Sequence, residues 1–275
     1  MRRAEHQAGD GRLTLGGCMT HEIADTVAGR VREARRILFI TGAGISADSG
    51  LPTYRGTGGL YNGRLTESGL PIEEVLSGEM FARAPEVTWS YLLEIERHCR
   101  GAAPNAAHRA IAELERDKAV TVLTQNIDGL HRAAGSRDVI EIHGTLNRLC
   151  CLSCGKVRTV EDFAGFEQPP ACDACGRMLR PDVVLFGEML PPAALAALEA
   201  RLLGGLDLIV SVGTTSVFPY IAEPVYVGRA CGIPTVEINP EETCVSACVD
   251  HVWRTGAAQA MTAVMQRIRQ QALGS

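Results

Sequence analysis

The sequence predicts an α/β protein with a doubly wound parallel sheet and a separate small lobe. Short, nearly continuous apolar runs alternate with helical patterns along most of the 275 residues, as expected for strands that helices cover on both faces. The first run leads into Gly-x-Gly-x-x-Ala at residues 42–47, the turn that cradles a dinucleotide. Two stretches, 56–101 and 150–180, interrupt the alternation, and we expect them to form the small lobe.

The elements of the large lobe follow from apolar periodicity. The predicted strands are residues 37–41, 120–124, 139–142, 183–186, 208–212 and 235–238. The predicted helices carry apolar faces within residues 23–34, 106–115, 195–202 and 261–268. Residues 1–18 are glycine-rich and aperiodic, so we expect a disordered tail that ends just before Met19.

The glycine turn departs from the layout of a hydride-transfer enzyme. Gly50 and Pro52 follow it at once and would end any helix there, so the chain should leave the sheet as a loop. A dehydrogenase carries an acidic ribose anchor roughly twenty residues past the glycines, whereas residues 56–62 form a glycine-rich run with no second strand before it. The sequence therefore predicts a dinucleotide held in a different way.

Composition argues against several classes of protein. The formal net charge is −5 and the pI is about 5.8, which gives no support to nucleic-acid binding through phosphate neutralisation. No apolar run approaches the ~20 residues of a membrane span, and no signal-peptide core follows Arg2 and Arg3. We expect a cytoplasmic protein with no direct nucleic-acid partner and no membrane partner; the oligomeric state stays open.

Four of the ten cysteines have the spacing of a zinc ribbon. Cys151-x-x-Cys154 and Cys172-x-x-Cys175 are each followed by glycine, and such turns let the thiolates converge on one tetrahedral ion. A pair of reduced turns or a redox dithiol is the alternative. Because no open ligand position or nearby histidine suggests catalysis, we predict one structural zinc.

Polar residues follow four of the predicted strands. They are Gln125 to Asp128, His143 with Gly144, Gly213 to Ser216, and Asn239 to Glu241. Each of them alone could be only a turn. Because the carboxyl ends of parallel strands meet at one sheet edge, the four together predict a site. The histidine is placed to act as a base near neutral pH.

In this order the motifs resemble those of the sirtuins, a family of NAD-dependent protein lysine deacylases. The matching elements cover about residues 20–270 and read GAGIS, SGLPTYR, TQNIDGLH, IHG, the two cysteine pairs, LRPDVVLFGE, GTTSVFP and INPEE. The resemblance implies a Rossmann-like NAD-binding domain, which we assign to residues 19–55, 102–148 and 181–275. The small domain would combine a helical part, 56–101, with a zinc-ribbon part, 149–180.

The resemblance also implies a reaction and the residues that carry it. An acyl-lysine carbonyl would attack the anomeric carbon of the nicotinamide ribose, which leads to nicotinamide, free lysine and O-acyl-ADP-ribose. NAD is then a co-substrate, acyl-lysine proteins are the partners, and His143, as general base, and Asn126 are the catalytic residues. The implied NAD-binding residues are Gly42, Ala43, Gly44, Ser46, Ala47, Asp48, Tyr54, Arg55, Gln125, Asn126, Asp128, Gly213, Thr214, Ser216, Asn239 and Ala258. The implied edge for the substrate peptide is Val183, Phe186, Gly187 and Glu188.

Departures from the family pattern predict the acyl group. The PTYR segment resembles the branch that includes desuccinylases, which carry Tyr-x-x-Arg on a small-domain helix to pair with the acyl carboxylate. Here Tyr91 is followed by Glu94, and the alternative register has Leu92 and Ile95. Neither register supplies a cation. We therefore predict neutral acyl groups, acetyl or somewhat longer, unless Arg97 reaches the pocket.

Two further functions compete with deacylation. ADP-ribosyl transfer to protein, or simple NAD hydrolysis, would use the same co-substrate. The presence of both Asn126 and His143 favours deacylation, because a base is needed after nicotinamide has left. The other alternative is a non-catalytic NAD-sensing interaction module, against which the complete set of site residues argues.

Overall fold

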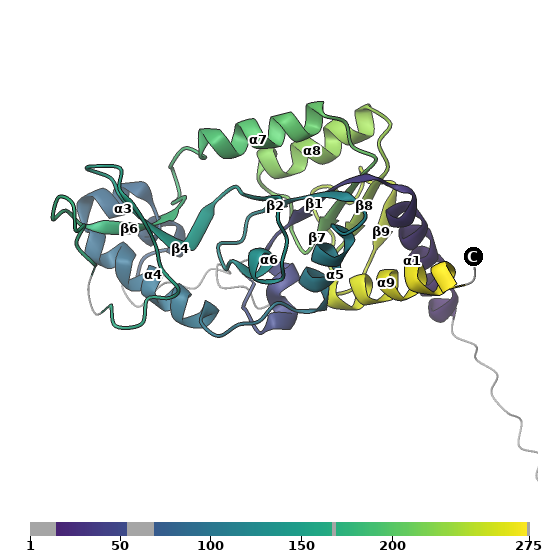
Figure 1. Ribbon diagram of the computed structural model, residues 1–275, viewed down its shortest axis with the longest axis horizontal. Helices are drawn as coiled ribbons and strands as arrows, with labels where there is room; N and C mark the ends of the chain where they lie inside the picture. The colour runs from purple at the N-terminus through teal and green to yellow at the C-terminus, as the bar shows by residue number, and fades with distance from the viewer. Residues whose placement is uncertain (1–14, 54–68, 167–168, 274–275) are drawn as a thin grey trace, which may run out of the picture.

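The computed structural model describes residues 15–53, 69–166 and 169–273 and shows a larger and a smaller lobe joined end to end (Figure 1). The larger lobe contains a six-stranded sheet and the smaller one a three-stranded sheet. The predicted α/β fold with a separate small domain is confirmed. Tyr54 and Arg55, two of the predicted NAD-binding residues, fall outside the described residues.

The large sheet is parallel throughout and has the strand order β3-β2-β1-β7-β8-β9. Its strands are β1 (Arg36–Thr41), β2 (Ala119–Thr124), β3 (Val139–Glu141), β7 (Leu208–Val212), β8 (Thr235–Ile238) and β9 (His251–Trp253). Successive strands are added on one side of β1 up to β3 and on the other side from β7 onward. The order in which strands are added therefore reverses between β1 and β7. The carboxyl ends of these two strands border a crevice suited to ligand binding.

Helices cover both faces of this sheet (Figure 1). One face carries α1 (Leu15–Glu33), α5 (Ala106–Leu114) and α9 (Ala257–Leu273), and the other carries α7 (Pro192–Leu203) and α8 (Pro219–Ala230). In β1 the side chains of Ile37 and Phe39 join the first core, whereas Leu38 and Ile40 join the second. This alternation explains why the strand is apolar at every one of these positions.

Two short helices and the start of α1 complete the large lobe. The predicted loop after β1 is a 3-10 segment, η1 (Ala43–Ser49), which ends at Gly50 in the left-handed region with φ +82°. The helix α6 (Leu130–Ala133) follows β2. Helix α1 begins at Leu15, earlier than the Met19 start expected from the sequence. None of the helices in the described ranges is both long and apolar enough to cross a membrane.

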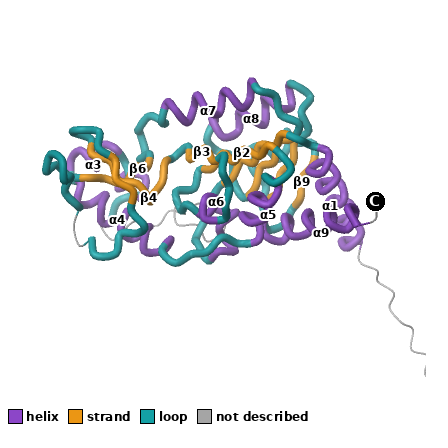
Figure 2. The backbone as a smooth tube through the Cα atoms, in the orientation of Figure 1, coloured by secondary structure: helices purple, strands orange, loops and turns teal. Residues whose placement is uncertain are grey.

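The small lobe joins the two segments that interrupted the sequence pattern (Figure 2). Its antiparallel sheet has the order β5-β4-β6, and its elements are β4 (Gly144–Cys151), β5 (Val157–Thr159), β6 (Leu179–Val183), α2 (Ile72–Val75), α3 (Gly78–Arg83) and α4 (Pro85–Cys99). Trp89 of α4 is almost fully buried, its ring centroid lies 5.8 Å from that of Phe163, and its indole N–H donates to the carbonyl of Leu179 at 3.1 Å. The helical and cysteine-rich segments thus share one core.

The expected strand at residues 183–186 was wrong. β6 ends at Val183 and pairs with β4 in the small sheet, Val184 and Leu185 lie outside the strands, and Phe186 makes an isolated parallel bridge with Ser77. A short apolar run fits a buried position in either sheet, so its partner is decided by distant pairing rather than by local pattern. β9 was not predicted, because its three residues lie at the sheet edge and two of them are only half-buried.

The crossing from the large sheet to the small one depends on Gly144. This residue has φ +76°, and a Cβ there would lie 1.9 Å from the carbonyl oxygen of Asp182, which belongs to the paired strand β6. Only glycine fits both the left-handed backbone and this close approach. The position of His143, one residue earlier, is set by the same crossing.

We expect Gly144→Ala to lower the free energy of unfolding by about 1–3 kcal/mol more than Gly165→Ala. Gly165 is a matched control, because it has φ +83° but no atom within 4 Å of the position that a Cβ would take, so both variants carry the left-handed strain and only the first adds a backbone clash. Denaturant unfolding followed by circular dichroism measures the difference. Equal destabilisation of the two variants would contradict the assigned role of the close approach.

Candidate active site

The carboxyl ends of five parallel strands border one cavity of about 560 Å³. Of the residues predicted for NAD and peptide binding, the cavity is lined by Gly42, Ala43, Gly44, Ala47, Asp48, Gln125, Asn126, His143, Val183, Phe186, Gly187, Glu188, Gly213, Thr214 and Asn239. Ser46, Asp128, Ser216 and Ala258 are not among its lining residues. The structure therefore brings most of the predicted site together, and Ser46 and Asp128 lie behind Asn126.

The glycine turns that follow β1 and β7 meet at the point where the strand order reverses. The amide of Gly44 donates to the carbonyl of Gly213 at 2.8 Å. A Cβ on Gly213, which has φ +60°, would lie 2.3 Å from the amide nitrogen of Ile45, and a Cβ on Gly42 would lie 2.8 Å from Thr214 Cβ. The two turns therefore pack backbone against backbone, because a Cβ on any of these glycines would strike the facing turn. They form a glycine cradle on the cavity wall, which fits the close approach of a dinucleotide diphosphate.

The Asn126 side chain is held from behind by a buried polar cluster. Its amide nitrogen donates to the carbonyl of Gly42 and to Ser46 Oγ, both at 3.1 Å. Ser46 Oγ in turn donates to Asp128 Oδ2 at 2.7 Å, and Asp128 Oδ1 accepts the amide of Leu130 at 2.9 Å. Burial raises the pKa of Asp128. Ser46 and Asp128 thus support Asn126, and the orientation of its amide follows from these partners.

Two buried histidines continue this cluster below the cavity. The rings of His108 and His131 lie 4.8 Å apart, and burial lowers their pKa values to about 4 and about 3, so both are neutral near pH 7. His131 Nε2 is 2.9 Å from Thr41 Oγ1. His108 Nδ1 accepts the amide of Asn105 at the start of α5, which leaves Nε2 to donate toward Ser46 at 3.5 Å. Neither histidine was given a role from the sequence, although the Asn-x-x-His helix start was a signal for His108.

His143 lies between the two lobes with both ring nitrogens engaged. Its Nδ1 is 3.0 Å from the carbonyl oxygen of Gln125, and its Nε2 is 2.7 Å from the hydroxyl of Tyr220. Burial lowers the pKa of His143, so the imidazole is neutral near pH 7. Tyr220 lines the cavity and was not singled out from the sequence, because it lies beyond the polar turn that follows β7.

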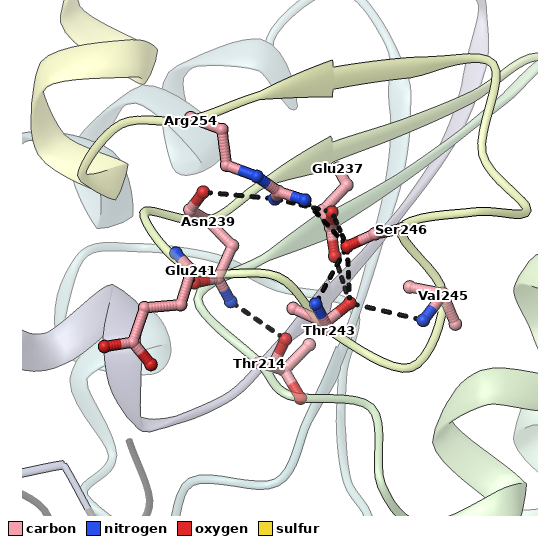
Figure 3. Close-up of polar contacts among 8 residues, drawn as sticks. All are labelled: Thr214, Glu237, Asn239, Glu241, Thr243, Val245, Ser246 and Arg254. Carbon is pink, nitrogen blue, oxygen red and sulfur yellow. Dashed lines mark hydrogen bonds and ion pairs between the residues drawn. The ribbon is translucent and has the colours of Figure 1, made fainter. Parts of the chain in front are cut away.

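The far end of the cavity is fixed by a buried carboxylate (Figure 3). Glu237 of β8 is completely buried and accepts hydrogen bonds from Thr243, from Ser246 Oγ at 2.6 Å, and from the guanidinium of Arg254 at 2.8 Å. This network holds the loop after β8, where Asn239 donates to the carbonyl of Thr214 at 3.0 Å. The asparagine was predicted from its place after the strand, whereas the carboxylate within the strand was missed.

The small-lobe side of the cavity is apolar. Its wall consists of Leu76, Leu92, Ile95, Ile127, Val183, Leu185, Phe186 and Leu190. On α4 the register with Leu92 and Ile95 faces the cavity, whereas Tyr91 and Arg97 are not among its lining residues. No lysine or arginine occurs among the residues described as lining it.

Glu188 faces the cavity but is already paired. Its carboxylate accepts two hydrogen bonds from the buried Arg180, at 2.6 and 3.0 Å, and one from the amide of Leu185 at 2.9 Å. Arg180 holds the pKa of Glu188 below its usual range against the opposing effect of burial. Glu188 therefore fixes the loop of residues 183–188, and its charge is compensated within the protein.

The four predicted zinc ligands form one cluster at the small lobe. The sulfurs of Cys151, Cys154, Cys172 and Cys175 all lie within 4.8 Å of one another, with pairs at 3.5 and 3.7 Å. Four thiolates at 2.3 Å around a tetrahedral zinc would be about 3.8 Å apart, so the cluster fits the ion. Gly155 and Gly176, at φ +74° and +70°, make the turns that follow each pair. Four protein ligands fill the coordination sphere, which is typical of a structural site.

Comparison with known proteins identifies the family. The model of the Sir2 family matches residues 42–219. The NAD-dependent protein deacylase 2 of Pseudomonas aeruginosa is 54% identical over 243 residues, which cover 87% of this chain and 94% of that protein. The chain belongs to the Sir2 family.

Solved structures of Sir2 homologues share the fold. A mutant of one homologue in complex with ADP-ribose has a TM-score of 0.83 and 36% identity and covers 90% of this chain and 97% of its own. A complex of a Sir2 homologue with NAD has a TM-score of 0.80 and 36% identity and covers 90% of this chain and 94% of its own. The resemblance stated from the sequence motifs is confirmed for the family.

For this Sir2 protein we expect one zinc ion per chain and a stabilising role for it. Removing the metal with a strong chelator, or replacing Cys154 with alanine, should lower the free energy of unfolding by about 3 kcal/mol or more, because ligand binding and folding are coupled. Metal analysis by mass spectrometry and thermal unfolding measure both effects. Cys231→Ala, at an exposed thiol outside the cluster, is the control. A fully stable, metal-free protein would contradict the assignment.

Proposed function

We propose that this protein is an NAD-dependent protein lysine deacylase that releases nicotinamide and transfers the acyl group to ADP-ribose. The observation that carries the proposal is the joint position of Asn126 and His143 at the carboxyl ends of β2 and β3, on one cavity with a glycine cradle and an apolar wall. The name of the Pseudomonas aeruginosa relative agrees with this activity. If the protein has this activity, its substrates are proteins that carry acyl-lysine.

The glycine turns and the Asn239 loop would hold NAD. The backbone of the two glycine turns, at Gly42 to Gly44 and at Gly213 and Thr214, is suited to the close approach of the diphosphate, and Asn239 to the adenosine half. When bound there, NAD supplies an electrophilic anomeric carbon and a nicotinamide leaving group. Ser46 and Asp128 would act through Asn126, since they hold its amide in place. Ala258 would act through Asp48, because Asp48 lines the cavity and accepts the amide of Ala258 at 3.4 Å.

His143 would be the general base. The Gln125 carbonyl can only accept, so Nδ1 carries the proton and Nε2 keeps its lone pair. A neutral imidazole with an unprotonated Nε2 can take a proton from a ribose hydroxyl near pH 7. Burial lowers the pKa of His143, so the activity should fall only when the pH drops below the range in which the imidazole is neutral.

The loop of residues 183–188 would align the substrate peptide. One side of it is already anchored, since Val184 N–H donates to the carbonyl of His143 at 2.9 Å and Phe186 N–H to that of Leu76 at 2.9 Å. A peptide added along this extended segment would place its acyl-lysine next to His143 with little dependence on sequence. We also propose a cytoplasmic location, because none of the nine cysteines whose side chains the structure describes forms a disulfide, and four of them form the metal-type cluster.

The first test is mass spectrometry of the products from one acetyl-lysine peptide with NAD. We expect nicotinamide, deacylated peptide and O-acetyl-ADP-ribose in equal amounts, and a loss of roughly 10²-fold or more in kcat for His143→Ala. His98→Ala, at an exposed histidine of α4, is the control and should retain full activity.

Other products would identify the competing functions. Plain ADP-ribose with an intact peptide would indicate NAD hydrolysis, and a peptide heavier by ADP-ribose would indicate a transferase to protein. Binding of NAD without any turnover, unchanged in His143→Ala, would indicate the interaction module.

For the acyl group we expect kcat/KM on acetyl-lysine peptides to exceed that on succinyl-lysine peptides by roughly tenfold or more. A succinyl carboxylate would be buried against an apolar wall whose described residues include no lysine or arginine. Ile95→Arg adds a cation to the lining face of α4 and should raise the succinyl-to-acetyl ratio. Glu94→Arg adds a cation at an exposed position that does not line the cavity and should not. A wild-type preference for succinyl peptides would contradict the prediction.

A further inference from the structure

Tyr220 makes a hydrogen bond that the proposed mechanism does not use. Its hydroxyl lies 2.7 Å from His143 Nε2, and both residues line the cavity. The other ring nitrogen, Nδ1, is 3.0 Å from the carbonyl oxygen of Gln125. Since a carbonyl can only accept, Nδ1 carries the proton, Nε2 offers its lone pair, and the Tyr220 hydroxyl is the donor.

The position of this hydroxyl is set by rigid neighbours. Tyr220 is the second residue of α8, directly after Pro219, whose ring fixes the backbone at the helix start. The rings of Phe218 and Tyr220 are stacked, with centroids 5.4 Å apart and planes 13° apart. Both rings meet the imidazole edge to face, at 5.9 and 5.8 Å. The phenol is therefore held toward His143 by packing from α8 as well as by its hydrogen bond.

We propose that Tyr220 is a positioning residue for His143. The Tyr220 hydroxyl holds the imidazole ring with Nδ1 protonated, and it occupies the position at Nε2 that a substrate hydroxyl takes when the substrate binds. This inference rests on the proposed function of His143 as a base. A ribose hydroxyl that donates to Nε2 has to take the position of the Tyr220 hydroxyl. In the free enzyme the lone pair that will accept the proton is thus already aimed into the cavity.

The bond also changes how readily the imidazole takes up a proton. A donor on the lone pair stabilises the neutral form and so lowers the histidine pKa, in the same direction as burial. Within the ranges that the structure describes, the charged side chains that line the cavity are the carboxylates Asp48, Glu188, Glu241 and Glu242, and their negative charge would raise the His143 pKa. The hydrogen bond donated by Tyr220 and the burial of the ring both lower the His143 pKa, against the effect of these carboxylates.

The test is an NMR titration of the His143 ring in the full chain without NAD. Wild type is compared with Tyr220→Phe, and His143→Gln serves only to assign the signal. Loss of the donor should raise the His143 pKa by about half a unit to one unit, the equivalent of one hydrogen bond. Tyr226→Phe is the matched control, because Tyr226 is an exposed tyrosine of the same helix whose hydroxyl bonds to the carbonyl of Cys244. It should leave the His143 pKa unchanged.

Two further measurements separate this inference from the proposed function. The acidic limb of the pH dependence of kcat/KM should move upward in Tyr220→Phe by the same amount as the NMR pKa. If the NMR shift occurs and no acyl-lysine peptide is turned over, the hydrogen bond is as inferred and the proposed function is wrong. If wild type deacylates peptides and Tyr220→Phe leaves the His143 pKa unchanged, the inference is overturned.

A second variant guards against effects of packing. Tyr220→Leu removes the hydroxyl and the ring, and circular dichroism checks that each variant folds. A rise of the His143 pKa in both Tyr220 variants supports the role of the hydroxyl. A rise in Tyr220→Leu alone would assign the effect to the ring and overturn the proposal.

Discussion

The rest of the site depends on the backbone contact between the glycine turns after β1 and β7. Gly44 and Gly213 are joined by an amide-to-carbonyl hydrogen bond of 2.8 Å, and no side chain fits between them. Because β1 and β7 are neighbours in the sheet, this contact closes the floor of the crevice where the strand order reverses. Gln125 then reaches Thr214 Oγ1 at 2.7 Å, and the loops from both halves of the sheet face one cavity.

The polar side chains that line the cavity are held in place by side chains that do not line it. Asn126 is bound by Ser46, which is bound by Asp128, and the neutral histidines His108 and His131 fill the space beneath. Such buried polar chains are tolerated where their members are paired, and once paired they restrict the side chains to one arrangement. The same principle applies to Glu188 with Arg180 and to Glu237 with Arg254. The cavity is therefore preorganised at these points, and one of its lining carboxylates, Glu188, is compensated from behind by Arg180.

Local patterns predicted those parts of the molecule that depend on nearby residues. The apolar strands, the glycine turns, the cysteine knuckles and the polar residues at strand ends all have short sequence signals, and the structure contains them. The membership of β6 in the small sheet, the edge strand β9 and the partner of His143 depend on residues far apart in sequence. Tyr220 is 77 positions from His143, and nothing local marks it. Glu237 lies within the predicted strand 235–238, and nothing nearby in the sequence marks it as functional. Its buried charge is compensated by Arg254, which lies just past the end of the neighbouring strand β9.

The strand β4 links the metal cluster to the active site in one continuous segment. It begins at Gly144, next to His143, and ends at Cys151, the first cysteine of the cluster. At about 3.3 Å per residue the seven steps between the two ends span roughly 23 Å. The backbone between them pairs with β6 on one side and, at Arg148 to Cys150, with β5 on the other. The base and the metal cluster therefore lie at opposite ends of one strand, and the irregular pairing between Thr145 and Leu149 separates the half next to the base from the half next to the cysteines.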